Sequence, residues 1–86
     1  RLVIQMVKVI FYNLLRSKYH VKEMLVEPGT IHHIISQVLE AHTEMDINDF
    51  KTCVIFNKGN PIHYRGFHKI IEDHEEIIIT HFVGGG

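Results

Sequence analysis

Residues 71–86 read IEDHEEIIITHFVGGG, and this stretch carries the strongest indication of fold in the chain. The β-branched run at residues 77–83 predicts a buried strand, because a short continuous apolar run bounded by turn residues is typical of one. The four acids within residues 72–76 predict a solvated turn that leads into this strand. Three glycines at residues 84–86 follow the strand directly, and glycine backbone passes through narrow spaces where any β-carbon would collide.

The most regular helical pattern lies upstream, in residues 30–40. Apolar residues recur there at i, i+3, i+4, i+7 and i+8, namely Ile31, Ile34, Ile35, Val38 and Leu39. Thr30 follows Pro28 and Gly29 and is a favoured N-cap, since its hydroxyl accepts a hydrogen bond from an amide of the first turn. The sequence therefore predicts one amphipathic helix that packs on a sheet.

The remaining apolar runs predict strands that complete an α+β domain. In a first strand at residues 6–12, alternation places Lys8, Ile10 and Tyr12 on the face opposite the buried one. The other expected segments are a second strand at about residues 19–27, a polar connection at 41–51 with a short turn around 47–50, a third strand at 52–56, a short edge strand at 61–64, and a helical turn or irregular cover at 67–71. The order is β-β-α-β-(β)-β, a mixed sheet of four or five strands on one main helix.

Composition restricts the class of function. At 86 residues the chain is expected to form one small domain, and its net charge of -1 offers no basic excess for binding a phosphate backbone. No run approaches the roughly 20 apolar residues of a membrane helix. Neither nucleic acid nor membrane is therefore expected as a partner. The single Cys53 excludes an internal disulfide and a cysteine-ligated cluster, which fits a reducing, cytoplasmic compartment.

The titratable residues suggest no catalytic or metal centre. The eight histidines lack zinc-site spacing, adjacent His32 and His33 point in different directions on a helix, and only His63 and His68 are placed to converge. We interpret Cys53 as a small buried thiol rather than a nucleophile. The expectation is a protein without a bound metal or catalytic group of its own.

The block at residues 71–86 resembles the C-terminal motif of the MoaD/ThiS sulfur-carrier family, which has a ubiquitin-like β-grasp fold. In that family a leucine-like residue, an aspartate-glycine-aspartate turn and an apolar strand precede two prolines, an apolar residue, a small residue and a glycine pair. The matching positions here are Ile71, Asp73, Glu75, Val83, Gly84 and the pair Gly85-Gly86.

The resemblance extends over residues 6–86. Residues 7–16 resemble the family's first strand and leucine-arginine loop, residues 30–39 its helix, and Phe56-Asn57 its apolar-asparagine turn. There are two departures. His74 stands where the turn usually has glycine, a position at which histidine takes φ > 0 at some cost, and His81-Phe82 replace the two prolines. The length is closer to that of the molybdopterin-type carrier than to that of the thiazole type.

The resemblance implies a carrier rather than an enzyme. In such carriers an E1-like partner uses ATP and Mg²⁺ to adenylate the terminal carboxylate, here that of Gly86 with Gly85 before it. Sulfur then replaces AMP and gives a thiocarboxylate. A second partner, a cofactor-synthase large subunit or another sulfur-accepting enzyme, receives the sulfur for molybdopterin or thiamine-type biosynthesis. No cofactor bound to the carrier itself is implied.

The resemblance also suggests how the chain is divided and where partners bind. We expect a β-grasp domain at residues 6–83, a flexible glycine tail at 84–86 and an N-terminal extension at 1–5. The partner-binding candidates are Ile10, Tyr12, Arg16, Ile78, Phe82, Val83 and Gly84. The same tail leaves two other functions open, a ubiquitin-like protein modifier and a β-grasp interaction module that is never conjugated.

Overall fold

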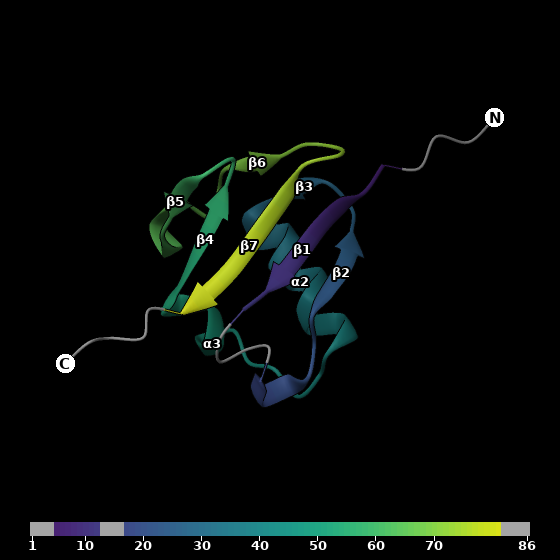
Figure 1. The fold of residues 1–86 in the computed structure, drawn as a ribbon, viewed down its shortest axis with the longest axis vertical. Coiled ribbons are helices and arrows are strands. Elements are labelled where there is room, and N and C mark those ends of the chain that lie inside the picture. The colour runs from purple at the N-terminus through teal and green to yellow at the C-terminus, as the bar shows by residue number, and fades with distance from the viewer. Residues whose placement is uncertain (1–4, 13–16, 82–86) are drawn as a thin grey trace.

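A five-stranded mixed sheet with one long helix across its inner face forms the body of the protein (Figure 1). The computed structural model describes residues 5–12 and 17–81. The sheet order is β2-β1-β7-β4-β5, with β1 (Val7–Phe11), β2 (Glu23–Val26), β4 (Cys53–Asn57), β5 (Asn60–Ile62) and β7 (Glu76–His81). The middle strand, β7, runs parallel to β1 and antiparallel to β4. The predicted α+β class, with five strands on one main helix, is confirmed.

The helix α2 (Ile31–Ala41) begins at the predicted residue for the predicted reason. The hydroxyl of Thr30 accepts a hydrogen bond from the backbone N–H of His33 at 3.1 Å, which satisfies one of the first-turn amides. The apolar positions of the helix face the sheet, and the buried ones are Ile31, Ile34, Ile35 and Val38. This stripe covers one face of the sheet, and no helix within residues 5–12 and 17–81 covers the other (Figure 1).

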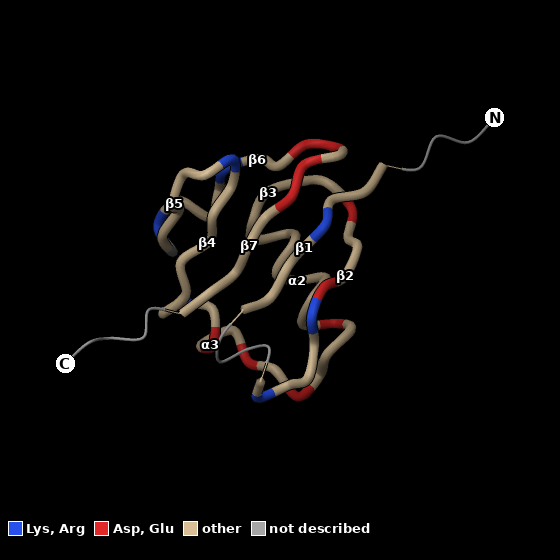
Figure 2. Tube along the Cα trace, in the orientation of Figure 1, with Lys and Arg blue, Asp and Glu red and all other residues tan. Residues whose placement is uncertain are grey.

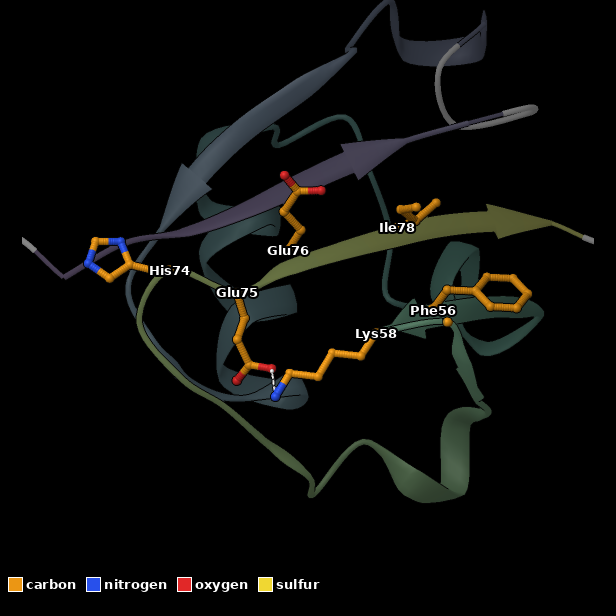
Figure 3. Close-up of a pocket in the computed structure, with 7 residues that line it drawn as sticks. Phe56, Lys58, His74, Glu75, Glu76 and Ile78 are labelled. Atoms are coloured by element: carbon orange, nitrogen blue, oxygen red, sulfur yellow. Dashed lines mark ion pairs between the residues drawn. The ribbon is translucent and has the colours of Figure 1, made fainter.

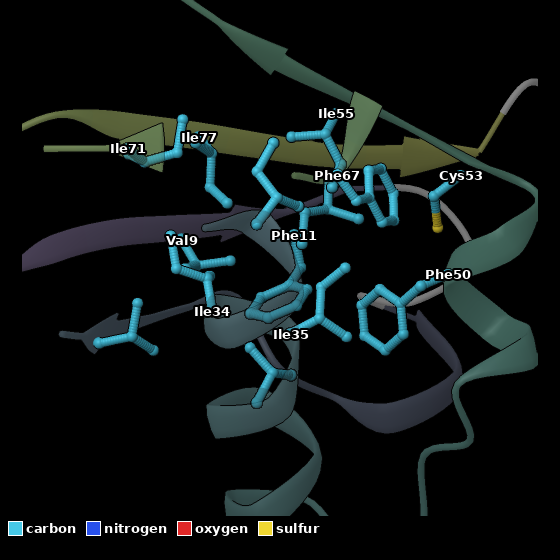
Figure 4. Close-up of a cluster of buried hydrophobic side chains, with 14 of the residues drawn as sticks. Val9, Phe11, Ile34, Ile35, Phe50, Cys53, Ile55, Phe67, Ile71 and Ile77 are labelled. Carbon is cyan, nitrogen blue, oxygen red and sulfur yellow. The ribbon is translucent and has the colours of Figure 1, made fainter. Parts of the chain in front are cut away.

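The core fills the space between α2 and the sheet (Figure 4). Alternate residues of β1 and β7 point into it, and these are Val7, Val9, Phe11, Ile77 and Ile79. Phe50 and Phe67, from outside the sheet, are also fully buried in this cluster. Because the inner face is filled, contacts with another protein are left to the outer face and the edges.

The second predicted strand is wrong in its first half. Residues 17–19 are helical, and β2 begins only at Glu23. Tyr19 uses its hydroxyl to donate a 2.7 Å hydrogen bond to the carboxylate of Asp49, a residue 30 positions away. That partner lies in α3 (Asn48–Lys51), a short helix at the predicted turn around residues 47–50. A long-range contact of this kind leaves no local pattern in the sequence.

A second, two-stranded sheet was not predicted. In it β3 (Gly29–Thr30) pairs antiparallel with β6 (Ile70–Ile71). The 3-10 helix η1 (Tyr64–Gly66) precedes β6 and replaces the end of the edge strand that the sequence suggested at 61–64. The cover expected at 67–71 is therefore partly regular, and two of its own residues, Phe67 and Ile71, are fully buried in the core.

His74, which stands where the resembled motif usually has glycine, takes the left-handed conformation in spite of its side chain, with φ at 67°. A non-glycine residue in this conformation raises the free energy of the folded state by about 1–2 kcal/mol. Glycine avoids that strain, but it loses more backbone entropy on folding, which costs about 0.5–1 kcal/mol. We therefore expect His74→Gly to raise the free energy of unfolding by about 0.5–1 kcal/mol, measured by denaturant titration. His63 is the control, because it is also exposed but is not among the described residues with a positive φ. His63→Gly should therefore lower the free energy of unfolding. Equal changes in the two variants would contradict the conformational explanation.

Candidate functional site

The sheet face opposite α2 carries a row of apolar side chains that crosses four strands. In the strand register Ile10 lies beside Ile78, Ile78 beside Phe56, and Phe56 beside Pro61. Pro61 is exposed and the other three are half-buried. We call Ile10, Ile78, Phe56 and Pro61 the open-face row. Apolar residues that are adjacent on a surface are more informative than scattered ones, because contiguous apolar patches mark interaction sites.

The two sides of the open-face row differ in chemistry. On one side Lys8 of β1 lies in register with Glu76 of β7. On the other side Tyr12 follows β1, and its backbone N–H donates to the carbonyl of Ile79 at 2.9 Å, which extends the β1–β7 pairing by one residue. The side chain of Tyr12 is 42% exposed. The row is thus bordered by charge toward the start of β7 and by an amphipathic aromatic ring toward its end.

A hollow of about 520 Å³ opens at the charged side of the row (Figure 3). Phe56 and Ile78 supply its apolar wall. Lys58 and Glu75 also line it and reach toward one another, with Nζ and Oε1 3.3 Å apart. The remaining lining residues are Gly59, His74 and Glu76. The hollow suits a partner segment in which an apolar side chain stands next to a polar one.

The carboxylate of Glu75 fixes the turn that leads into β7. One oxygen accepts a hydrogen bond from the backbone N–H of Glu72 at 2.6 Å, and the other accepts one from the side-chain amide of Asn57 at 3.1 Å. The hydrogen bond from Glu72, helped by those from Asn57 and Lys58, outweighs the opposing effect of burial and lowers the pKa of Glu75. Glu75 is therefore ionised at neutral pH and holds one edge of the hollow in place.

Charge is distributed unevenly around this face (Figure 2). Acidic residues gather in the turn between β6 and β7, whereas Lys8 and Lys58 lie on the strand and turn beside it. Only some of these acids are available to a partner. Asp73 accepts a hydrogen bond from the backbone N–H of Met6 at 2.9 Å, and Glu75 is held as described above. Glu72 and Glu76 are exposed.

Three of the predicted partner-binding residues lie on the outer side of the sheet. Ile10 of β1 and Ile78 of β7 are register partners, and Tyr12 follows β1 two residues after Ile10. Arg16, Phe82, Val83, Gly84, Gly85 and Gly86 lie outside the described residues. Phe56 was not among the candidates, although alternation in the third strand already placed it opposite Ile55. What the sequence did not show was that β4 pairs with β7, which brings Phe56 beside Ile78.

Cys53 is a buried structural residue in the described part of the chain. It is 2% exposed, and burial, with a smaller contribution from the charge of Asp49, raises the pKa of its thiol to about 12. A thiol with this pKa stays protonated at neutral pH and is a poor nucleophile.

Within residues 5–12 and 17–81, no group of three or more histidine, cysteine, aspartate or glutamate side chains is placed to hold a metal ion. None of the helices in that part of the chain has the length and apolar character needed to cross a membrane.

Comparison with known proteins shows the fold. No family model matches the chain, and no curated protein matches it. Among solved structures, the chain is similar to the solution structure of small archaeal modifier protein 1 from Methanosarcina acetivorans, with a TM-score of 0.77 and 21% sequence identity. The alignment covers 95% of this chain and 97% of that one. The protein therefore has a ubiquitin-like β-grasp fold, as expected from residues 71–86.

Proposed function

We propose that this protein is a sulfur carrier of the MoaD/ThiS type, whose C-terminal glycine is activated by a partner enzyme. The observation that carries the proposal is the open-face row, which includes Ile78 of β7, the strand that precedes the glycines at residues 84–86. An E1-like adenylating enzyme binds this row and receives the segment that continues from β7. The carrier supplies the docking face and the carboxylate of Gly86, while the partner supplies the nucleotide site.

The arrangement of β7 supports this division of work. β7 is paired with β1 over residues 76–79 and with β4 over residues 77–81, so each of its residues has a partner on at least one neighbouring strand. Ile78 of the open-face row lies on the same strand, three residues before its last residue, His81. A partner that binds Ile78 is thereby aligned with the chain that leaves β7. Fixing a reacting group relative to a binding surface lowers the entropic part of the activation barrier.

The chemistry begins at the carboxylate of Gly86, which is unreactive toward nucleophiles as an anion. One carboxylate oxygen attacks the α-phosphorus of ATP, pyrophosphate leaves, and a mixed anhydride with AMP forms. A sulfide sulfur that attacks the acyl carbon, with AMP leaving with the bonding electrons, gives the thiocarboxylate directly. A persulfide that attacks in the same way gives an acyl disulfide, and a second thiolate of the partner then breaks its S–S bond, forming a disulfide on the partner and releasing the thiocarboxylate. The terminal glycine becomes a thiocarboxylate, which is the form that donates sulfur. Molybdopterin biosynthesis is the pathway we favour, since the length is closest to that of its carrier.

Mass spectrometry tests this proposal directly. The intact chain is incubated with an E1-like enzyme, ATP, Mg²⁺ and a sulfur donor. The expected result is a mass gain equal to the difference between one sulfur and one oxygen atom, located at Gly86 by fragmentation. A chain lacking Gly86 is the control and should not change in mass. Persistent absence of an acyl-adenylate and a thiocarboxylate on the unaltered chain, with enzymes from the same genome, would refute the proposal.

Protein modification is the second candidate function, favoured by the structural likeness to a protein named as a modifier. Activation of Gly86 would be the same, but the acyl group would pass to a lysine amine and form an isopeptide bond. Peptides carrying the C-terminal residues of this chain on lysine, found by proteomics in the host, would favour this candidate. If the host keeps its partner functions after deletion of Gly85-Gly86, the protein is instead an interaction module that is never conjugated.

A further inference from the structure

The two edges of the main sheet differ in how open they are (Figure 1). β5, at one end of the strand order, is three residues long and has Pro61 in its middle, which offers no backbone N–H to a further strand. β2, at the other end, is four residues long and has no proline. Within residues 5–12 and 17–81, no strand pairs with the outer side of β2. An edge of this kind can take up an extended segment of another protein.

The pairing of β1 with β2 determines which peptide groups of β2 point outward. The backbone N–H of Phe11 donates to the carbonyl of Lys22 at 2.9 Å, which makes these two residues a hydrogen-bonded pair. Hydrogen-bonded and non-hydrogen-bonded pairs alternate along an antiparallel ladder. Met24, two residues after Lys22, therefore also directs its N–H and C=O toward β1. The N–H and C=O of Glu23 and Leu25 point away from the sheet.

The contact between Glu27 and Gln37 marks the end of the open edge. Glu27 is the next residue in the alternation whose peptide groups point outward, and the side-chain amide of Gln37, in α2, is bonded to both of them. Oε1 of Gln37 accepts from the N–H of Glu27 at 2.7 Å, and Nε2 donates to its carbonyl at 3.0 Å. The amide thus takes the place that a neighbouring strand would occupy. The peptide groups of Glu23 and Leu25 remain for a partner.

The side chains along this edge have an alternating chemistry. Leu25 lies opposite Lys8 in the register, and Glu23 lies opposite Ile10, so both are on the sheet face that α2 does not cover. Period-two alternation places Glu27 on the same face. Leu25 is 56% exposed, and both glutamates are exposed. One apolar side chain therefore stands between two carboxylates along the edge.

The charge of the surrounding chain has the same sign as this edge. Residues 23–50 contain six acids and neither lysine nor arginine, the acids being Glu23, Glu27, Glu40, Glu44, Asp46 and Asp49. Residues 51–71, which include β5, contain no acid but four basic residues, Lys51, Lys58, Arg65 and Lys69 (Figure 2). Lys8, opposite Leu25, lies in register with Glu76 on its other side. Charge complementarity therefore favours a basic partner at the edge of β2.

We propose that the outer edge of β2 is a docking site for an extended, basic segment of a partner protein, which joins the five-stranded sheet as a further strand. The segment's backbone bonds to the peptide groups of Glu23 and Leu25. An apolar side chain of the segment packs on Leu25, and a lysine or arginine two residues to either side pairs with Glu23 and Glu27. This site lies at an edge of the sheet and does not depend on activation of Gly86, so the inference goes beyond the proposed function.

The test uses a short synthetic peptide with valine at its centre, lysine two residues to either side and threonine elsewhere. Its matched control has glutamate in place of both lysines. At low salt, the lysine peptide should shift the amide resonances of residues 22–27 of the nitrogen-15-labelled chain. It should also slow hydrogen exchange of the Leu25 N–H, which in the free chain exchanges faster than the Met24 N–H. The glutamate peptide should bind about tenfold more weakly or less.

Variants separate the backbone contribution from the charge contribution. Leu25→Pro removes the outward N–H without breaking the pairing with β1, and it should weaken binding of the lysine peptide by about tenfold or more, whereas Leu25→Ala keeps the N–H and should weaken it by about threefold. Glu23→Gln with Glu27→Gln should weaken it by about five- to tenfold. The control, Asn60→Lys with His63→Lys, changes the net charge equally at the opposite edge and should stay within about twofold. If Leu25→Pro does not fold, the glutamine variants decide alone.

Three results would refute the site: no binding of the lysine peptide, equal binding of both peptides, or unchanged affinity in the folded Leu25→Pro and double-glutamine variants. Sedimentation of the chain alone tests the other occupant. A mass that doubles with rising concentration, together with protection of the Leu25 N–H, would show that a second copy of the chain covers the edge, and the basic partner would be ruled out. None of these measurements involves Gly86, so failure here leaves the proposed function standing, and the reverse also holds.

Discussion

Replacing Ile78 by lysine is expected to lower kcat/KM for activation by an E1-like enzyme by about 30- to 1,000-fold. Ile78 lies in the middle of the open-face row, between Ile10 and Phe56. Removing a central apolar residue from an interface weakens the binding free energy by about 2–4 kcal/mol or more. Each 1.4 kcal/mol corresponds to about a factor of ten in affinity. Lysine adds the cost of desolvating a charge without a partner. The measurement is the rate of pyrophosphate release as a function of carrier concentration.

Two further variants keep this prediction independent of folding. Ile10→Lys changes the neighbouring strand and should reproduce the loss. Ile70→Lys is the control, because Ile70 is 64% exposed but belongs to the two-stranded sheet, and its rate should stay within about threefold. Unfolding curves establish that all three variants are folded at the assay temperature. Folded Ile78→Lys and Ile10→Lys variants with ordinary rates would show that the open-face row is not the docking surface.

Removing the side-chain amide of Asn57 is expected to cost about 2–4 kcal/mol of folding free energy. Asn57 is the one buried polar residue of the described chain, at 1% exposure. Its amide nitrogen donates to the Glu75 carboxylate at 3.1 Å and to the Glu76 carbonyl at 3.2 Å. Asn57→Ala leaves these acceptors without that donor and opens a small void. A domain of this size has about 5–10 kcal/mol of stability in total, so the melting temperature should fall by about 10–25 °C.

The matched control is Asn60→Ala, an exposed asparagine three residues further along the chain, which should change stability by less than about 0.5 kcal/mol. Asn57→Asp provides a second variant of nearly equal volume. Its carboxylate would face that of Glu75, so it should be as damaging as alanine at neutral pH. Part of the loss should return below about pH 4, where carboxyl groups protonate and again offer a donor. Equal stability of Asn57→Ala and Asn60→Ala would refute the role assigned to Asn57.

The parts of the fold that were predicted are those with a local cause. The stripe from Ile31 to Leu39 and the cap at Thr30 depend on residues within three or four positions of one another, and both are present in the structure. The pairing of β3 with β6 depends on two residues from each of two segments about 40 positions apart. Such short strands have no periodicity of their own, so the sequence could not indicate them.

In the candidate site, too, the features with a local cause were predictable and those with a long-range cause were not. Alternation within each strand was enough to place Ile10 and Ile78 on an outer face. Alternation could not show which strands are neighbours, because sheet order is determined by packing over the whole domain. β4 and β7 are not consecutive strands, and they become neighbours only through a crossover. The contact between Nε2 of His81 and the carbonyl oxygen of Asp49 could not be derived either, since it requires α3 to lie beside the end of β7.

The parallel pairing of β1 with β7 has a mechanical consequence. A force that pulls the start of β1 and the end of β7 in opposite directions would load all of their shared hydrogen bonds together, in shear, rather than opening them one after another. Proteolytic machines that grip a chain by its end would therefore meet resistance at the middle of the sheet, and forced unfolding is governed by this kinetic barrier. In the carrier function proposed above, which requires release of the intact protein after each delivery, such resistance to being pulled apart would be an advantage.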